Sequence, residues 1–211
     1  MFPPSGNFLL FLSAALVLAI TPGPGIFYVM ARSLKGGRSE GIASALGTAA
    51  GGMGHVIAAA FGLSVVLATS AVAFSVVKYG GAAYLVYLGV KTIIGDNEMP
   101  QHDAIAVTGS RRAFSQGIAV ELLNPKTALF FLAFIPQFVE PTGTVYLQFI
   151  GLGTISVLLN TSADFVVAAL AGPIGEQLQA HRRLRLGQRI FTGSSLIALG
   201  GYVALTGNHR S

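Results

Sequence analysis

The sequence contains no cysteine among its 211 residues, and only 10% of its residues are charged. The absence of cysteine excludes disulfides, thiolate metal sites and cysteine nucleophiles. Soluble domains carry about a quarter charged residues, so this chain could not cover a globular surface with groups that water solvates. The composition therefore predicts that the surrounding medium is a lipid bilayer.

Several functional motifs are also missing from the sequence. It has no Gly-x-x-x-x-Gly-Lys-[Ser/Thr] loop for ATP, no paired-histidine metal spacing and no Gly-x-Ser-x-Gly turn. The net charge is +5, but the basic residues do not form a patch interleaved with aromatic residues, so we expect no nucleic-acid partner. No basic residue precedes the first apolar run, which favours a permanent span over a cleaved signal peptide. We expect neither a cofactor nor a metal ion.

Long uncharged runs dominate the sequence instead. Residues 1–31, 41–77 and 141–163 contain no Asp, Glu, Lys or Arg, and a membrane-spanning helix needs roughly 20 apolar residues. The run 41–77 would be about 55 Å long as one helix, which is nearly twice the hydrocarbon thickness, so we expect a turn near Thr69 and Ser70. The sequence predicts an all-α membrane protein with six transmembrane helices at residues 8–30, 42–67, 71–94, 114–138, 143–171 and 190–207.

The basic residues alternate between the connections of these six helices. Ten of the thirteen Lys and Arg lie in or beside the first, third and fifth connections. By the positive-inside rule, these connections are cytoplasmic, and both termini lie outside the inner membrane. We expect a single transporter domain over 1–211, in which a three-span half (1–94) is joined by a flexible cytoplasmic connection (95–112) to an inverted half (113–211).

Proline interrupts the first span of each half. Such a residue removes a helical hydrogen bond, and the freed backbone groups survive in a membrane only where they face protein or a watery cavity. Paired interruptions in two inverted halves indicate a transporter binding site, although two independent kinks that only help packing remain the alternative. The expected substrate-binding residues at the interruptions are Pro22, Gly23, Pro24, Asn124, Pro125 and Lys126.

Asp164 is the strongest candidate for proton coupling. Ser156, Asn160 and Asp164 recur every four residues and therefore form one polar stripe on the fifth span. We expect the stripe to face the interior of the bundle, with Asn160 at the substrate and Asp164 exchanging a proton. A structural aspartate bonded to a neighbouring helix is the alternative.

Glu121 and His55 are the secondary candidates for proton coupling. Glu121 precedes the interruption in the fourth span, where it could also simply pair with Lys126. His55 can titrate near physiological pH and follows Gly47 and Gly51 at four-residue spacing. That spacing of small residues is typical of close helix packing, which we expect of the glycines.

Several short sequence blocks follow one another in order along the chain: residues 20–24, the glycine-rich second span, 81–89, 123–131, 136–138 and 199–200. In these blocks the sequence resembles the LysE/RhtB-type amino-acid translocator family. The resemblance runs through nearly the whole chain, and the order and spacing of the blocks are more specific than any single one. It implies proton-driven export of small amino acids or related metabolites, with substrate binding at the two proline motifs and an acidic residue in the fifth span.

The resulting functional prediction is a secondary transporter that exports a small-molecule amino-acid substrate across the inner membrane. An intramembrane enzyme and a passive channel are the alternatives. The sequence does not name the amino acid, and it leaves homo-oligomer formation open.

The distribution of basic residues gives a testable topology. Alkaline phosphatase, which is active only outside the cytoplasm, is expected to be active when fused after Gly207 and inactive when fused within residues 100–108, because the Lys- and Arg-rich connections stay inside. An inactive first fusion or an active second one would show that the orientation is reversed.

Overall fold

The computed structural model describes residues 5–95, 109–140, 143–180 and 182–205. Over these residues all regular secondary structure is helical. The predicted flexibility of 95–112 falls mostly on residues outside this range. The elements are α1 (Ser5–Ile20), α2 (Pro24–Ala58), the π-helical turn η1 (Ala59–Leu63), α3 (Ser64–Thr69), α4 (Ala71–Ile94), α5 (Ser110–Leu122), α6 (Pro125–Leu129), the π-helical turn η3 (Phe130–Phe134), the 3₁₀ turn η4 (Ile135–Phe138), α7 (Val145–Ala180) and α8 (Arg182–Leu205).

The first predicted interruption is a real break between α1 and α2. Helix α1 ends at Ile20, and residues 21–23 are not helical. Gly23 has an extended backbone as the residue before α2, and Pro24 occupies the first helical position. Proline is favoured there because its missing N–H would have had no helical partner.

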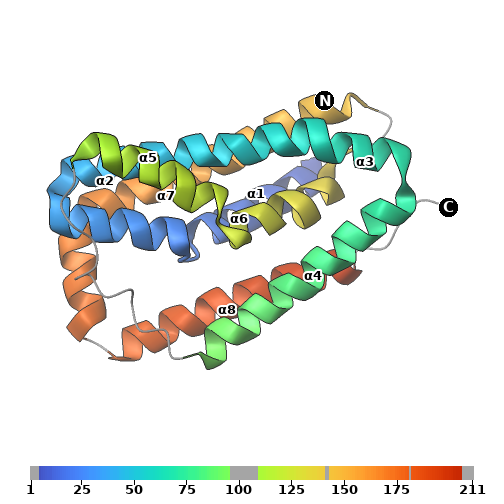
Figure 1. Cartoon of the computed structure of the whole chain (residues 1–211). Helices are drawn as coiled ribbons and strands as arrows, with labels where there is room; N and C mark the ends of the chain where they lie inside the picture. The colour runs from blue at the N-terminus through green and yellow to red at the C-terminus, as the bar shows by residue number, and fades with distance from the viewer. Residues whose placement is uncertain (1–4, 96–108, 141–142, 181, 206–211) are drawn as a thin grey trace.

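The expected connection around residues 31–41 is present as a single tight bend, with helix on both sides of it. The only non-helical residue inside α2 is Gly37, with φ 71° and ψ −175°, and the chain reverses direction there (Figure 1). This backbone region is essentially restricted to glycine. One glycine is therefore enough to fold a single helical segment back on itself without a loop.

A buried ion pair closes the bend at Gly37. Arg32 Nη1 donates to Glu40 Oε2 at 3.2 Å, and both side chains are 4% exposed. Arg32 also donates to the Tyr28 hydroxyl at 3.1 Å and to Gln116 of α5. Glu40 Oε1 accepts a hydrogen bond from the backbone N–H of Gly109. The bend is thus fastened to the start of α5.

The turn expected near Thr69 and Ser70 is confirmed. Helix α3 ends at Thr69, Ser70 is extended, and α4 begins at Ala71. The Ser70 hydroxyl oxygen accepts a hydrogen bond from the backbone N–H of Ala73, which satisfies one of the free N–H groups at the start of α4.

The second predicted interruption is also present. Helix α5 and the segment Pro125–Phe138 meet at an angle of 45°. Asn124 precedes α6, and its side-chain oxygen accepts from the backbone N–H of Lys126 at 3.1 Å. Pro125 again occupies the first helical position.

The last two helices are longer than expected. Helix α7 continues past residue 171 to Ala180, and α8 begins at Arg182 instead of 190. The fifth connection is therefore helical on both sides of residue 181. The Arg-rich sequence that suggested a loop is compatible with helix because arginine is a good helix former.

The helices pack in two groups (Figure 1). Helix α2 packs along α5 and α7, whereas α4 packs along α8. Glycines allow both contacts: a Cβ atom at Gly47 would lie 2.2 Å from the Phe114 carbonyl oxygen, and one at Gly193 would lie 2.5 Å from the Gly89 carbonyl oxygen. The close packing expected of Gly47 and Gly51 is confirmed, since a Cβ at Gly51 would lie 2.8 Å from the Ile118 carbonyl oxygen.

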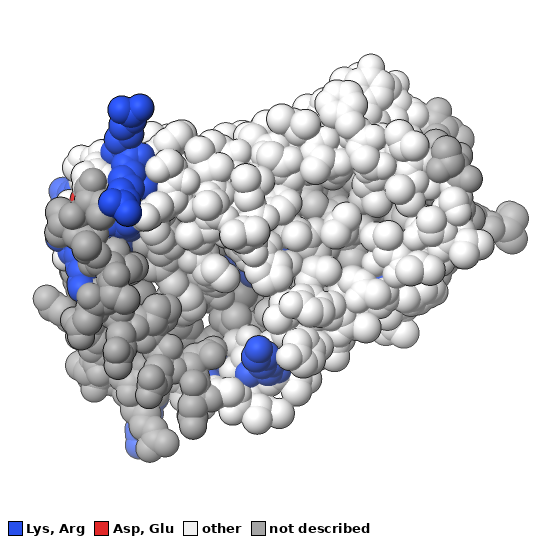
Figure 2. Space-filling model, viewed as in Figure 1, with Lys and Arg blue, Asp and Glu red and all other residues white. Residues whose placement is uncertain are grey.

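Three helical segments are long and apolar enough to cross a membrane, and a fourth qualifies if the bent α5–Phe138 pair is one span. Helix α1 contributes a shorter apolar helix, Asn7–Ile20. The protein is thus an all-helical, multi-pass membrane protein. Figure 2 shows that on the face in view most of the Lys and Arg lie at one end, and that the rest of the described surface there is almost free of charge.

The bend at Gly37 provides a stability prediction. Gly37→Ala should lower the free energy of unfolding by about 1–3 kcal/mol, because alanine is strained at this φ and ψ. Gly80→Ala is the control, since Gly80 is helical and a Cβ there meets nothing within 4 Å. Thermal melts of the detergent-solubilised proteins, followed by circular dichroism, should show a loss of stability only for Gly37→Ala. Equal melts for both variants would mean that the bend tolerates a side chain.

Candidate functional site

The two helix breaks lie against each other, and Lys126 joins them. Its ammonium nitrogen donates to the carbonyl oxygens of Leu18 at 3.1 Å and Thr21 at 2.7 Å. Leu18 is four residues before Pro22, so its carbonyl is one that loses a helical partner to the proline. The ammonium group also lies at the negative end of the α1 dipole. Lys126 therefore stabilises the first break from the second.

Glu121 lies at the opposite side of the first break, beside the start of α2. A Cβ atom at Gly25 would lie 2.7 Å from Glu121 Oε2, and one at Gly23 would lie 3.3 Å from the Lys126 ammonium nitrogen. A carboxylate is favoured near the N-terminal end of a helix, and no side chain caps α2. The two glycines thus let a cation and an anion approach the same short segment.

The carboxylate of Glu121 is held by neutral donors. Asn124 Nδ2 donates to Oε2 at 3.0 Å, and the Thr127 hydroxyl donates to Oε1 at 2.7 Å. The alternative that Glu121 simply forms an ion pair with Lys126 is wrong, because no ion pair joins these two described residues. Their charges still interact at longer range.

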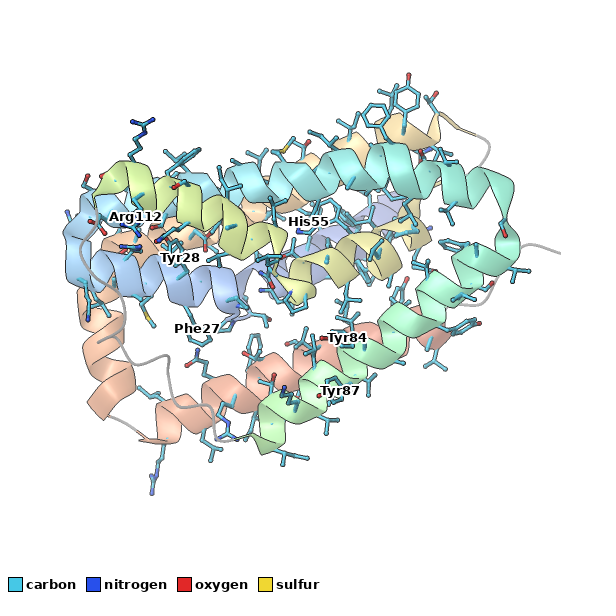
Figure 3. All side chains as sticks on the ribbon, viewed as in Figure 1. Phe27, Tyr28, His55, Tyr84, Tyr87 and Arg112 are labelled. Atoms are coloured by element: carbon cyan, nitrogen blue, oxygen red, sulfur yellow. The ribbon has the colours of Figure 1, made fainter. Side chains whose placement is uncertain are left out.

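His55 stabilises the second break. Pro125 has no N–H to donate to the Glu121 carbonyl, four residues earlier, and His55 Nε2 lies 3.0 Å from that oxygen. A carbonyl only accepts hydrogen bonds, so a hydrogen bond at this contact requires Nε2 to be the donor. The ring also stacks on Phe131 with centroids 5.8 Å apart. Figure 3 shows His55 lying between α2 and the segment that follows the break.

Asp164 is completely buried, with 0% exposure, in α7. Its Oδ2 accepts from the Thr48 hydroxyl of α2 at 2.8 Å, and that hydroxyl also lies 2.8 Å from the Ala45 carbonyl oxygen. Across the described residues, Asp164 Oδ1 has no hydrogen-bond partner. The charges of Glu121 and Lys126 lie close enough to act on Asp164 electrostatically.

A small cavity lies between Glu121 and the polar stripe of α7. Its volume is about 20 Å³, which is room for about one water molecule. Its lining combines hydroxyl and amide groups with apolar side chains, and among the residues that the structure describes Glu121 is the only ionisable one in the wall. The principal polar lining residues are Thr48, Glu121, Thr127, Ser156, Asn160 and Thr161.

The structure brings together most of the residues expected from the sequence. Gly23, Asn124, Lys126 and Glu121 meet at the two breaks, and Pro22 and Pro125 create them. The polar stripe faces the interior as expected, because Ser156 and Asp164 are buried and Asn160 lines the cavity. Pro24 differs from its neighbours in being exposed.

Sequence reasoning missed Thr21, Thr48 and Thr127. Each is buried and bonded to a charged residue of the site. Thr127 follows the Asn-Pro-Lys motif directly, so its position is a usable signal. A single threonine in a glycine-rich helix, such as Thr48, has no such signal. Among the described residues no group of three or more His, Asp or Glu could hold a metal ion.

Comparison with known proteins places this site in a family. The family model described as "LysE type translocator" matches residues 16–207, a range that includes both breaks and Asp164. The chain belongs to the LysE type translocator family. It is therefore a transporter and not an enzyme, which excludes the alternative of an intramembrane enzyme.

Relatives of this LysE type translocator cover most of its length. The homoserine/homoserine lactone efflux protein of Salmonella typhimurium is 29% identical over 195 residues, covering 92% of this chain and 94% of the relative. The membrane protein YrhP of Bacillus subtilis is 36% identical over 162 residues, covering 72% and 77%. A Vibrio cholerae membrane protein is 28% identical over 202 residues, covering 93% and 95%. No solved structure matches the chain.

Proposed function

We propose that this LysE type translocator exports homoserine-like amino acids, coupled to protons, across the inner membrane. The observation that carries the proposal is the contact of Lys126 and Glu121 with the first helix break, which gathers opposite charges beside a cavity inside the protein. The similarity to the homoserine/homoserine lactone efflux protein of Salmonella typhimurium supports efflux of a small amino-acid derivative.

We further propose the six-span arrangement of two inverted halves for this chain. The first span would comprise α1 and the part of α2 before Gly37, and the fourth would comprise α5 with the segment to Phe138. Two lines of support are the meeting of the breaks of these spans through Lys126 and the packing of α4, the third span of one half, along α8, the third span of the other.

In this proposal Lys126 and Asn124 bind the carboxylate of an amino-acid substrate. A small molecule would have to enlarge the cavity, since its present volume of about 20 Å³ is far below the roughly 300 Å³ or more of typical ligand sites. We therefore assign the structure to a closed state. Release of Lys126 from the Leu18 and Thr21 carbonyls would then accompany substrate entry.

In the same proposal Asp164 carries the coupling proton. The Thr48 hydroxyl has one hydrogen but two oxygen neighbours at 2.8 Å, the Ala45 carbonyl and Asp164 Oδ2. When the hydroxyl donates to the carbonyl, the second contact requires a proton on Asp164. A buried carboxyl with no ion pair is also far less costly when it is neutral. The closed state would thus be loaded with a proton.

The substrate proposal predicts transport defects at the second break. Asn124→Ala and Lys126→Ala should insert at normal levels but lose export, because they remove the groups assigned to the substrate carboxylate. Uptake of labelled homoserine into inverted vesicles measures this, with expression checked by immunoblot. Wild-type uptake by both well-expressed variants would contradict the assignment.

The coupling proposal predicts a different defect for Asp164→Asn. This variant keeps the size and the Thr48 contact but cannot titrate, so it should exchange homoserine across proteoliposomes yet fail to concentrate it with a proton gradient. The wild-type protein should concentrate it, whereas a passive channel would only equilibrate it. Uphill, proton-dependent transport by Asp164→Asn would leave Asp164 structural, with Glu121 and His55 as the remaining candidates.

A further inference from the structure

We infer that Glu121 is the residue that binds the ammonium group of the substrate. This inference rests on the proposed export function and assigns the class of ligand: small molecules with a primary ammonium group, with or without a carboxylate. It gives Glu121 a different role from the proton coupling expected from the sequence.

The first argument is that Glu121 has hydrogen bonds but no cation. The residue is 2% exposed, and its two oxygens accept from the neutral groups of Asn124 and Thr127. Buried charges in proteins are normally paired or coordinate metals. In the part of the chain that the structure describes, no Lys, Arg or His forms an ion pair with Glu121. The carboxylate is therefore preorganised by its donors and has no described cation in direct contact, while Lys126 acts on it only at longer range.

The second argument is the composition of the cavity wall. Glu121 is the only ionisable lining residue, and the other polar lining groups are neutral, including Ser156, Asn160 and Thr161. Lys126 does not line the cavity, because its ammonium is bonded to the carbonyls of Leu18 and Thr21. A ligand entering this space meets one negative group and no positive one. The cavity consequently selects an ammonium ion before it can bind a carboxylate.

The third argument separates Glu121 from Asp164. Asp164 has 0% exposure and is not part of the cavity wall. Thr48, whose hydroxyl bonds Asp164, does line the cavity. Once the cavity is enlarged, a ligand in it would contact Glu121 directly, whereas Asp164 lies behind Thr48. The two acids can thus serve binding and coupling separately.

The chemistry of the proposed substrates agrees with this division. Homoserine carries an ammonium and a carboxylate, whereas its lactone keeps the ammonium and has no carboxylate. Any site that accepts both must rely on the group they share. An acid facing the cavity supplies that recognition, and Lys126 adds a second contact only for ligands that have a carboxylate.

The test compares three ligands in proteoliposomes: homoserine, homoserine lactone and 4-hydroxybutyrate, which is homoserine without its amino group. We expect the wild-type protein to transport the first two and 4-hydroxybutyrate to compete at least about tenfold more weakly. Glu121→Gln should raise the KM for homoserine and its lactone at least about tenfold, which corresponds to about 1.4 kcal/mol. Glu140→Gln makes the same chemical change at an exposed residue and should behave as wild type.

The outcomes separate this inference from the proposed function. Wild-type KM values for Glu121→Gln would overturn it, as would normal exchange with loss of uphill transport only, since that pattern marks a coupling acid. If Glu121→Gln fails to fold, the competition assay with the wild-type protein is the remaining test. Competition by 4-hydroxybutyrate as strong as that of homoserine would overturn the inference. Transport of none of the three ligands by the wild-type protein would overturn the proposed function, and the inference with it.

Discussion

The site depends on one constraint: carbonyl groups freed by proline inside an apolar helix must find donors within the protein. At the first break Lys126 bonds the Leu18 carbonyl, which also accepts from the Thr21 N–H, and it bonds the Thr21 carbonyl. At the second break His55 lies beside the Glu121 carbonyl, which also accepts from the Asn124 N–H. Each break is therefore stabilised by a side chain from the other half of the sequence. Polar groups that a membrane protein would otherwise avoid are gathered where the two halves meet.

This constraint also explains what could be predicted from the sequence. The prolines at 22, 24 and 125 change the backbone locally, so both breaks were predictable, as was the turn at Ser70. The stripe of Ser156, Asn160 and Asp164 follows from helical periodicity alone, so its burial could be predicted from spacing. These features depend on neighbouring residues in the sequence and need no knowledge of how helices pack.

The features that were missed depend on contacts between distant residues. The tightness of the bend at Gly37 was not predictable, because the charges of residues 31–41 suggested a longer loop. In the structure Arg32 and Glu40 neutralise each other across Gly37 and are buried. Thr48 gains its importance only because α2 packs along α7 and places it beside Asp164. Periodicity and composition do not contain that information.

The first part of α2 contacts α5 at two levels. Gly25 lies beside Glu121 at one level, and at the other Tyr28 bonds the Ala113 carbonyl and Arg32 bonds Gln116. Seven residues of helix separate Gly25 from Arg32, about 10 Å at 1.5 Å per residue. Both segments are helical between these two levels. The charge that faces the cavity is therefore connected to the bend at Gly37 through continuous helix on both sides.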